Sequence, residues 1–270
     1  NLVRFATFKD KLFLYIAKTY DHDTGSSLSQ KQISPIEDEY VDGTTWNPPS
    51  KVIWSNRPGP KTTSPRVIQG LVVKVMDDTL NIFVQYGGTR DLYRITSTDA
   101  VHFGTPEKIH TFTGNDCLLN GDVIARGSDK APLLAFLTKD DADGGKTSAG
   151  TIKLWTFDPK ATTSRVRLVA GTLPGHDSTP AGAYRDATLL AGDVAGCTPY
   201  GTTNLQIWGV GWGSGNVYHM QYVFNPEATS GAFNPTGITD HGSASSHVNE
   251  DWRGYLSSCI APQQTSNGSL

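Results

Sequence analysis

The feature that most constrains this chain is a pattern that returns four times along its 270 residues. At each pass a short polar turn is followed by an apolar, strand-like run, and the runs begin at Leu12, Leu80, Leu133 and Leu205. These positions are 68, 53 and 72 residues apart. Three or four short strands fit this spacing. One such unit cannot cover its own apolar faces, so neighbouring copies must stack against one another.

A second marker recurs downstream of the first and in the same order. Residues 42–52 align without gaps on residues 99–109, and residues 233–238 form a shorter copy. The aromatic residues of the three copies are separated by 57 and 130 positions, so a missing copy would fall near Val166. Two markers that recur at compatible spacing indicate a true structural repeat.

The local signals predict an all-β chain. The apolar runs are short, rich in β-branched and aromatic residues, and bounded by turn residues. The chain has 28 glycines and 15 prolines, and no long capped segment shows a helical apolar period. We predict a single β-propeller over residues 1–260 with four blades, five being the alternative, and a polar tail over residues 261–270. The strand-like segment 251–260 is expected to pair with the N-terminal strands and close the ring.

Two short segments resemble a known turn motif. Asp42-Gly43-x-Thr45-Trp46 resembles the Asp-box of sialidase-like propellers, and Ser97-x-Asp99-Ala100-x-x-Phe103 is similar to a weaker copy. The first lacks the leading Ser, and the second has Ala in place of Gly. The resemblance, like a looser one to propeller lectins, implies a hairpin turn in which Asp and Ser cap backbone amides and the aromatic ring packs between blades. It implies a propeller and no particular activity.

Charged residues accompany the strand expected to begin each repeat. Innermost strands of a propeller converge, so these side chains would gather at one channel mouth and bind hydroxyl-rich ligands. The alternative is that they pair with each other and hold the blades together. The predicted ligand-binding residues of this kind are Arg66, Arg185, Asp186, Glu250 and Asp251. A glycoside hydrolase needs two carboxylates around one bond, which Asp122, Asp186 and Asp251 could supply.

Aromatic residues concentrate in the last quarter of the chain. Trp212 lies in the glycine-rich segment 209–215, and Trp252 lies beside Asp251. Exposed aromatic rings can stack on sugars, so both are predicted ligand-binding residues, with packing between blades as the alternative.

Two acidic loops have the oxygen-rich spacing that calcium prefers. Asp21 and Asp23 lie in one, and Asp141 and Asp143 lie in the other. Asp- and Gly-containing loops are also common hairpin tips. Calcium is therefore a candidate ligand, and no cofactor is required by the sequence.

Net charge, the length of apolar runs and the cysteines limit the classes of protein to which the chain can belong. A net charge of -3 argues against a nucleic-acid-binding protein, and the lack of an apolar run near 18 residues argues against membrane insertion. Cys117, Cys197 and Cys259 allow one disulfide and one thiol, or three thiols. Few lysines and many Ser, Thr, Gly and Asn residues favour a secreted protein.

Taken together, the sequence predicts a secreted, lectin-like propeller that binds glycans without catalysis. The alternatives are a small glycoside hydrolase that uses the carboxylates named above and a propeller for protein interaction. Assembly into a homo-oligomer stays open.

Overall fold

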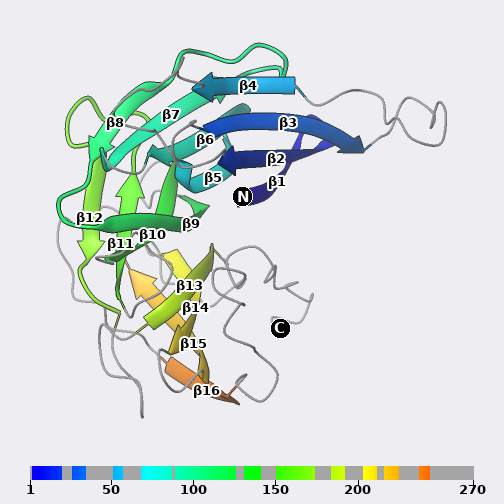
Figure 1. Ribbon diagram of the computed structural model, residues 1–270. Coiled ribbons are helices and arrows are strands. Elements are labelled where there is room, and N and C mark those ends of the chain that lie inside the picture. The colour runs from blue at the N-terminus through cyan, green and yellow to red at the C-terminus, as the bar shows by residue number, and fades with distance from the viewer. Residues whose placement is uncertain are drawn as a thin grey trace. The chain divides into compact units, whose positions relative to one another are not determined.

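The computed structural model describes residues 2–19, 26–34, 51–56, 68–86, 89–125, 131–140, 150–173, 184–191, 203–211, 216–224 and 237–243. Throughout these ranges the chain forms strands, turns and bends (Figure 1). The prediction of an all-β chain is confirmed. The segment 251–260 and the tail 261–270 lie outside the described residues, so closure of a ring and the number of blades stay predictions.

The strands form four antiparallel sheets of four strands each within the described part of the chain. The first sheet contains β1 (Leu2–Phe8), β2 (Lys11–Thr19), β3 (Ser26–Ser34) and β4 (Lys51–Asn56). The second contains β5 (Ile68–Met76), β6 (Thr79–Tyr86), β7 (Asp91–Ser97) and β8 (Glu107–Thr111). The third contains β9 (Asp116–Ala125), β10 (Pro132–Asp140), β11 (Thr151–Phe157) and β12 (Val166–Ala170). The fourth contains β13 (Tyr184–Ala191), β14 (Thr203–Gly211), β15 (Asn216–Phe224) and β16 (Gly237–Ser243).

Each sheet is a meander in which strands pair in chain order. The four repeat anchors, Leu12, Leu80, Leu133 and Leu205, all fall within the first three residues of the second strand of a sheet. Val166, where the missing copy of the second marker was expected, begins the fourth strand of the third sheet. The repeat read from the sequence is therefore the four-stranded sheet.

The first hairpin of the first sheet and the first hairpin of the second sheet have turns of the same kind, each made of two residues. Lys9 and Asp10 join β1 to β2, with Phe8 paired to Lys11, and Asp77 and Asp78 join β5 to β6, with Met76 paired to Thr79. All four turn residues have φ between 47° and 60°. Two consecutive positive φ values are the mark of the type I′ turn, whose twist suits a two-residue hairpin. The predicted polar turns are confirmed at both places.

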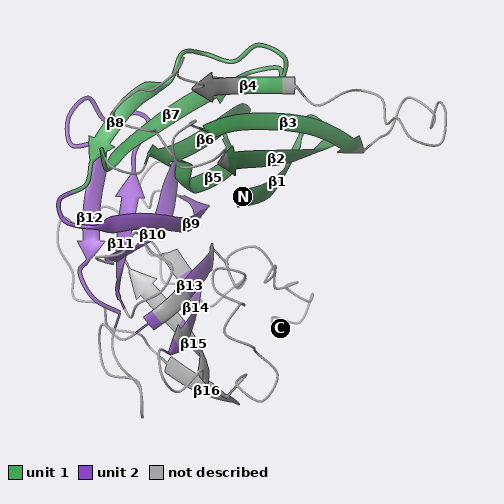
Figure 2. Cartoon of the chain, in the orientation of Figure 1, with its two compact units in different colours: residues 1–112 green, residues 113–270 purple. Residues whose placement is uncertain are grey.

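The chain divides into two compact units, residues 1–112 and residues 113–270 (Figure 2). In the first unit β1 and β2 lie against β5. Between the two sheets lies a core that includes Tyr15 and Leu28 from the first and Leu71 and Ile82 from the second, all fully buried. Burial of such side chains supplies the main stabilisation of each pair of sheets.

The second unit repeats this arrangement with the third and fourth sheets. Its core includes Leu137 and Leu154 from the third sheet and Leu205 and Met220 from the fourth. The backbone of Gly150, just before β11, forms an antiparallel bridge with Tyr184 at the start of β13. Further along, the Asn120 side chain of β9 bonds Thr188 of β13. Asp140 pairs with Asp116 of β9 and with Thr151, the residue after Gly150, so Asp116 and Gly150 lie at the same end of the third sheet. Going along the chain from this end, β9 reaches Asn120 and β13 reaches Thr188, so the two strands run in the same direction.

Candidate carboxylate site

The structure describes only part of the predicted site. Arg66, Trp212, Glu250, Asp251 and Trp252 lie outside the described residues, as do the calcium candidates Asp21, Asp23, Asp141 and Asp143. Arg185 and Asp186 lie in β13, where the backbone alone is described. These assignments, the calcium and the secreted location all stay predictions. Cys117 is a buried thiol in β9, and the other two cysteines lie outside the described residues, so the pairing stays open.

Asp122 does not lie at the head of its strand. The sequence predicted Asp122 near the beginning of the first strand of its repeat, whereas β9 begins at Asp116, six residues earlier. Asp122 is half-buried and accepts a bond from the Val123 amide at 2.9 Å. Since β9 and β13 run in the same direction, Asp122 lies two residues beyond the Asn120–Thr188 contact and Asp186 lies two residues before it. The backbone positions of Asp122 and Asp186 are therefore offset by four residues, or about 13 Å along the strands.

The carboxylate at the head of β9 is Asp116, and a second carboxylate faces it. Asp116 and Asp140 are direct partners across the β9–β10 ladder. The ammonium group of Lys153, from β11, lies 2.9 Å from Oδ2 of Asp116 and 2.9 Å from Oδ2 of Asp140. These two oxygens are therefore at most 5.8 Å apart. One lysine thus joins two carboxylates from neighbouring strands.

A chain of hydrogen bonds continues from Asp116 into the sheet. The Thr138 hydroxyl donates to Oδ1 of Asp116 at 2.8 Å, and the Trp155 indole donates to the Thr138 hydroxyl at 2.8 Å. Trp155 stacks on Phe136 with an interplanar angle of 9°. These hydrogen bonds orient the Asp116 carboxylate from inside the sheet.

Exposure differs sharply between the two carboxylates. The side chain of Asp116 is 1% exposed, while that of Asp140 is 38% exposed. Partial burial lowers the pKa of Lys153, but hydrogen bonds and charge interactions with Asp140 and Asp116 outweigh it, so the pKa is raised. The lysine stays charged across the neutral range. Asp140 is therefore a carboxylate that Lys153 holds in place and that solvent or a ligand can reach.

Sequence reasoning missed Asp116, Asp140 and Lys153 as a group. Asp140 had been read as the start of the acidic loop that follows it, and Asp116 lay before the expected strand. A usable signal was present in β10, whose apolar run ends in three consecutive polar residues, so that Thr138 and Asp140 occupy alternate positions. Alternate residues of a strand share a face, so these two polar groups had to have partners on one side of the sheet.

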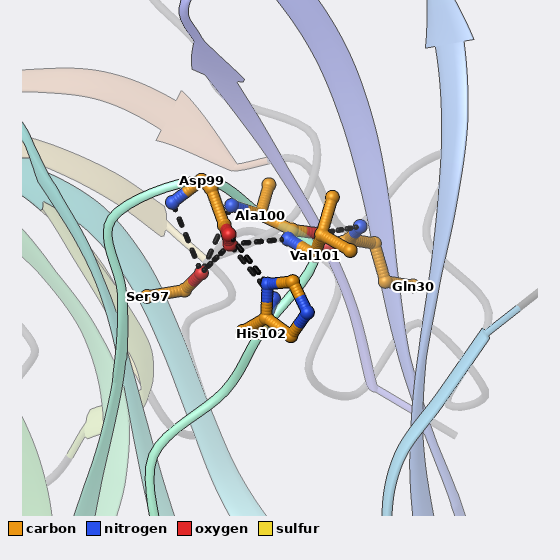
Figure 3. Close-up of polar contacts among 6 residues, drawn as sticks. All are labelled: Gln30, Ser97, Asp99, Ala100, Val101 and His102. Carbon is orange, nitrogen blue, oxygen red and sulfur yellow. Dashed lines mark hydrogen bonds and ion pairs between the residues drawn. The ribbon is translucent and has the colours of Figure 1, made fainter.

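The turn between β7 and β8 in the first unit is the motif that resembles an Asp-box (Figure 3). The Ser97 hydroxyl accepts a bond from the amide of Ala100 at 2.9 Å. Oδ1 of Asp99 accepts bonds from the amides of Val101 and His102, both at 2.7 Å. The predicted capping of backbone amides by Ser and Asp is confirmed. Ala100 takes the Gly position with a φ of 59° and is buried.

This turn also joins the first two sheets. Nε2 of Gln30, in β3, donates to the carbonyl of Ala100 at 2.9 Å (Figure 3). Phe103 packs against the core that lies between these sheets. The aromatic ring thus packs between two sheets, as the resemblance implied. The backbone amide of His102, followed by its ring and the amide of Val101, lowers the pKa of Asp99 well below 3.8. The motif is a structural element whose carboxylate keeps its negative charge to lower pH than an ordinary aspartate.

Across the described ranges, no group of three His, Cys, Asp or Glu side chains is arranged to hold a metal ion. In that same part of the chain no helix has the length and hydropathy needed to cross a bilayer.

Comparison with known proteins gives distant likenesses among solved structures alone. No protein-family model matches the chain, and no curated protein matches it. A solved structure from Bifidobacterium bifidum s17, a "putative exo-beta-1,3-galactanase", aligns with a TM-score of 0.41 and 9% identity. The alignment covers 82% of this chain and 66% of that protein, so this chain spans just under two thirds of its length.

This finding runs against the prediction of a lectin without catalysis, because the similar protein is named as an enzyme that acts on a galactan. We withdraw that prediction. At a TM-score of 0.41 the likeness supplies no argument about what this chain does. A functional assignment must therefore rest on the side chains of the chain itself.

Proposed function

We propose that the chain is a carbohydrate-active enzyme of the glycoside hydrolase class, with its site at the N-terminal ends of β9 and β13. The observation that carries the proposal is the half-exposed carboxylate of Asp140, held by the Lys153 ammonium and backed by buried Asp116. A carboxylate fixed in this way can face the anomeric carbon of a sugar without first having to be ordered.

Glycoside hydrolysis requires a second carboxylate near the same bond. Asp186 is the candidate that we retain from the sequence. Tyr184, two residues before it, is bridged to Gly150, and the next residue, Thr151, pairs with Asp140. The backbone therefore brings Asp186 to the end of the sheet where Asp140 lies, whereas Asp122 lies further along β9. Asp116 is too buried to touch a substrate and serves as a positioning residue.

The four meanders support a propeller as the frame of this site. In each unit the first strand of one sheet lies against the first strand of the next, as in successive blades around an axis. We propose four blades, closed by the segment 251–260. Asp251 would then join the same mouth.

Hydrolysis of a panel of aryl glycosides by the full chain tests this function. Asp140→Asn and Asp186→Asn each remove a carboxylate charge with little change of shape, and each is expected to lower kcat by about 100-fold to 10,000-fold. Asp122→Asn is the matched control, because it makes the same change on β9 away from the site, and its activity should be close to that of the parent.

Two results would contradict the proposal. One is a folded chain that cleaves no glycoside of the panel. The other is a reversed pattern, with Asp122→Asn inactive and Asp140→Asn fully active, which would move the site to the opposite end of β9. Circular dichroism of each variant separates loss of chemistry from loss of fold.

A further inference from the structure

A row of polar side chains crosses the inner face of the first sheet. Tyr15 in β2 lies directly opposite Arg4 in β1 and directly opposite Gln30 in β3. Directly opposite residues of antiparallel strands share a face, with Cβ atoms about 5 Å apart. The row lies on the face that packs against the second sheet, where Tyr15 belongs to the core.

Two atoms of this row are buried polar groups that the protein itself does not satisfy. Tyr15 has 0% exposure and Gln30 has 6%. Within the described part of the chain, the Tyr15 hydroxyl and Oε1 of Gln30 have no hydrogen-bond partner. Leaving one such group unsatisfied costs about 1–3 kcal/mol, and native proteins leave few buried polar groups without a partner.

The orientation of the Gln30 amide is fixed by its other contact. Its amide nitrogen donates to the carbonyl of Ala100 at 2.9 Å. A flipped amide would put an oxygen against that carbonyl, with no hydrogen between two acceptors. Oε1 must therefore face away from the turn, and it needs a donor on that side.

We propose that Tyr15 and Gln30 form a binding site for one internal water molecule between the first two sheets. Oε1 of Gln30 needs a donor, and the Tyr15 hydroxyl can donate to an acceptor, so the ligand must do both. Water meets this requirement, and an anion would be repelled by the amide oxygen. The half-buried guanidinium of Arg4, opposite Tyr15, disfavours a cation. The core cluster beside the row consists of hydrophobic side chains, which offer no further polar partner.

The bound water would join strands that the polar row already connects. It would accept from Tyr15 and donate to Gln30, and Gln30 in turn bonds the turn that resembles an Asp-box. The water, Gln30 and Ala100 then make one hydrogen-bonded path from β2 to the loop after β7. This role is independent of the proposed glycoside hydrolase activity.

Tyr15→Phe tests the proposal by the sign of its effect. If water occupies the site, Tyr15→Phe removes one of the hydrogen bonds to this water. The equilibrium constant for local closing of β2 and β3 then falls about fivefold to tenfold. If the hydroxyl has no partner in solution, its removal relieves a buried polar group and the constant rises. Amide hydrogen exchange across β2 and β3 of the full chain measures this constant. Tyr93→Phe, a half-buried tyrosine of the same unit, is the matched control.

A second measurement identifies the partner. Nuclear Overhauser contacts between the Tyr15 hydroxyl proton and a long-lived water are expected in the parent chain and absent in Gln30→Met. Two results overturn the proposal. The first is stabilisation by Tyr15→Phe. The second is destabilisation without a water contact in the parent, which would mean that Tyr15 bonds Gln30 directly.

Discussion

At the scale of single residues, short polar side chains replace backbone partners that the strands cannot supply. Ser97 and Asp99 satisfy the amides that follow β7, and Thr138 satisfies both Trp155 and Asp116. The resemblance to the Asp-box located the first group from the sequence, because all of its members lie within a few residues. The second group joins three strands, and no local pattern contains all its members.

Asp99 makes the stability of its turn depend on pH. Its pKa is lowered in the folded chain, chiefly by the backbone amide of His102. A lowered pKa stabilises the folded turn fully above the ordinary value of 3.8, and this contribution is lost as the pH falls from there toward the folded value.

As the pH falls below about 4, the amide proton shifts of Val101 and His102 should therefore move toward random-coil values. Nuclear magnetic resonance of the full chain measures them. Asp99→Asn keeps an acceptor but cannot ionise, so this movement should vanish. A variant that titrates like the parent would show that another group controls the turn.

At the scale of elements, the hairpin turns follow the sequence closely. A two-residue loop between strands demands positive φ at both positions, and the chain uses Lys-Asp and Asp-Asp where glycine would suit the second position best. Strand beginnings were harder to predict, as β9 shows. Its first residues include Asp116 and Asn120, and such polar residues do not indicate a strand in the sequence. Their hydrogen-bond partners come from β10, β11 and β13, so only the folded chain shows why they fit there.

Asp10→Gly should stabilise the first hairpin, because glycine adopts the φ of 60° found at Asp10 without a Cβ clash. The expected gain in the free energy of unfolding is about 0.5 kcal/mol. Relief of backbone strain in the folded chain stabilises the variant, and the greater conformational entropy of glycine in the unfolded chain offsets part of this gain. Asp78→Gly should behave alike. Asp158→Gly, at a turn residue that caps the amide of Lys160, should instead destabilise. Urea unfolding compares the three, and equal effects at all three would argue against the turn geometry.

At the scale of the whole molecule, the second unit depends on close backbone approach between its two sheets. Gly150 bonds Tyr184 in both directions, at 2.9 Å and 3.3 Å. A Cβ at Gly150 would lie 2.4 Å from the carbonyl oxygen of Asp140 and 2.7 Å from Lys139 side-chain carbons. Glycine is therefore required where the third and fourth sheets meet beside the carboxylate site.

Gly150→Ala should lower the free energy of unfolding by about 1–3 kcal/mol, since the backbone oxygen cannot move aside without breaking the ladder. It should also lower glycoside hydrolysis, because Asp140 and Asp186 are positioned through this contact. Gly171→Ala is the matched control, as no atom lies within 4 Å of the added Cβ. Thermal unfolding and the aryl glycoside assay measure both effects. Equal stability of the two variants would show that the sheets can separate at this point without cost.

The sequence by itself determined the all-β class, the four repeats and the two tight turns, because periodicity and turn chemistry act between near neighbours in the chain. The turn that resembles an Asp-box belongs to the same group. Only the tertiary structure brought together Asp116, Asp140 and Lys153, and placed Tyr15 beside Gln30. Those contacts depend on the register between strands, which is set by pairing and packing over the whole sheet. A carboxylate site or a buried water site is decided by that register, and no local pattern encodes it.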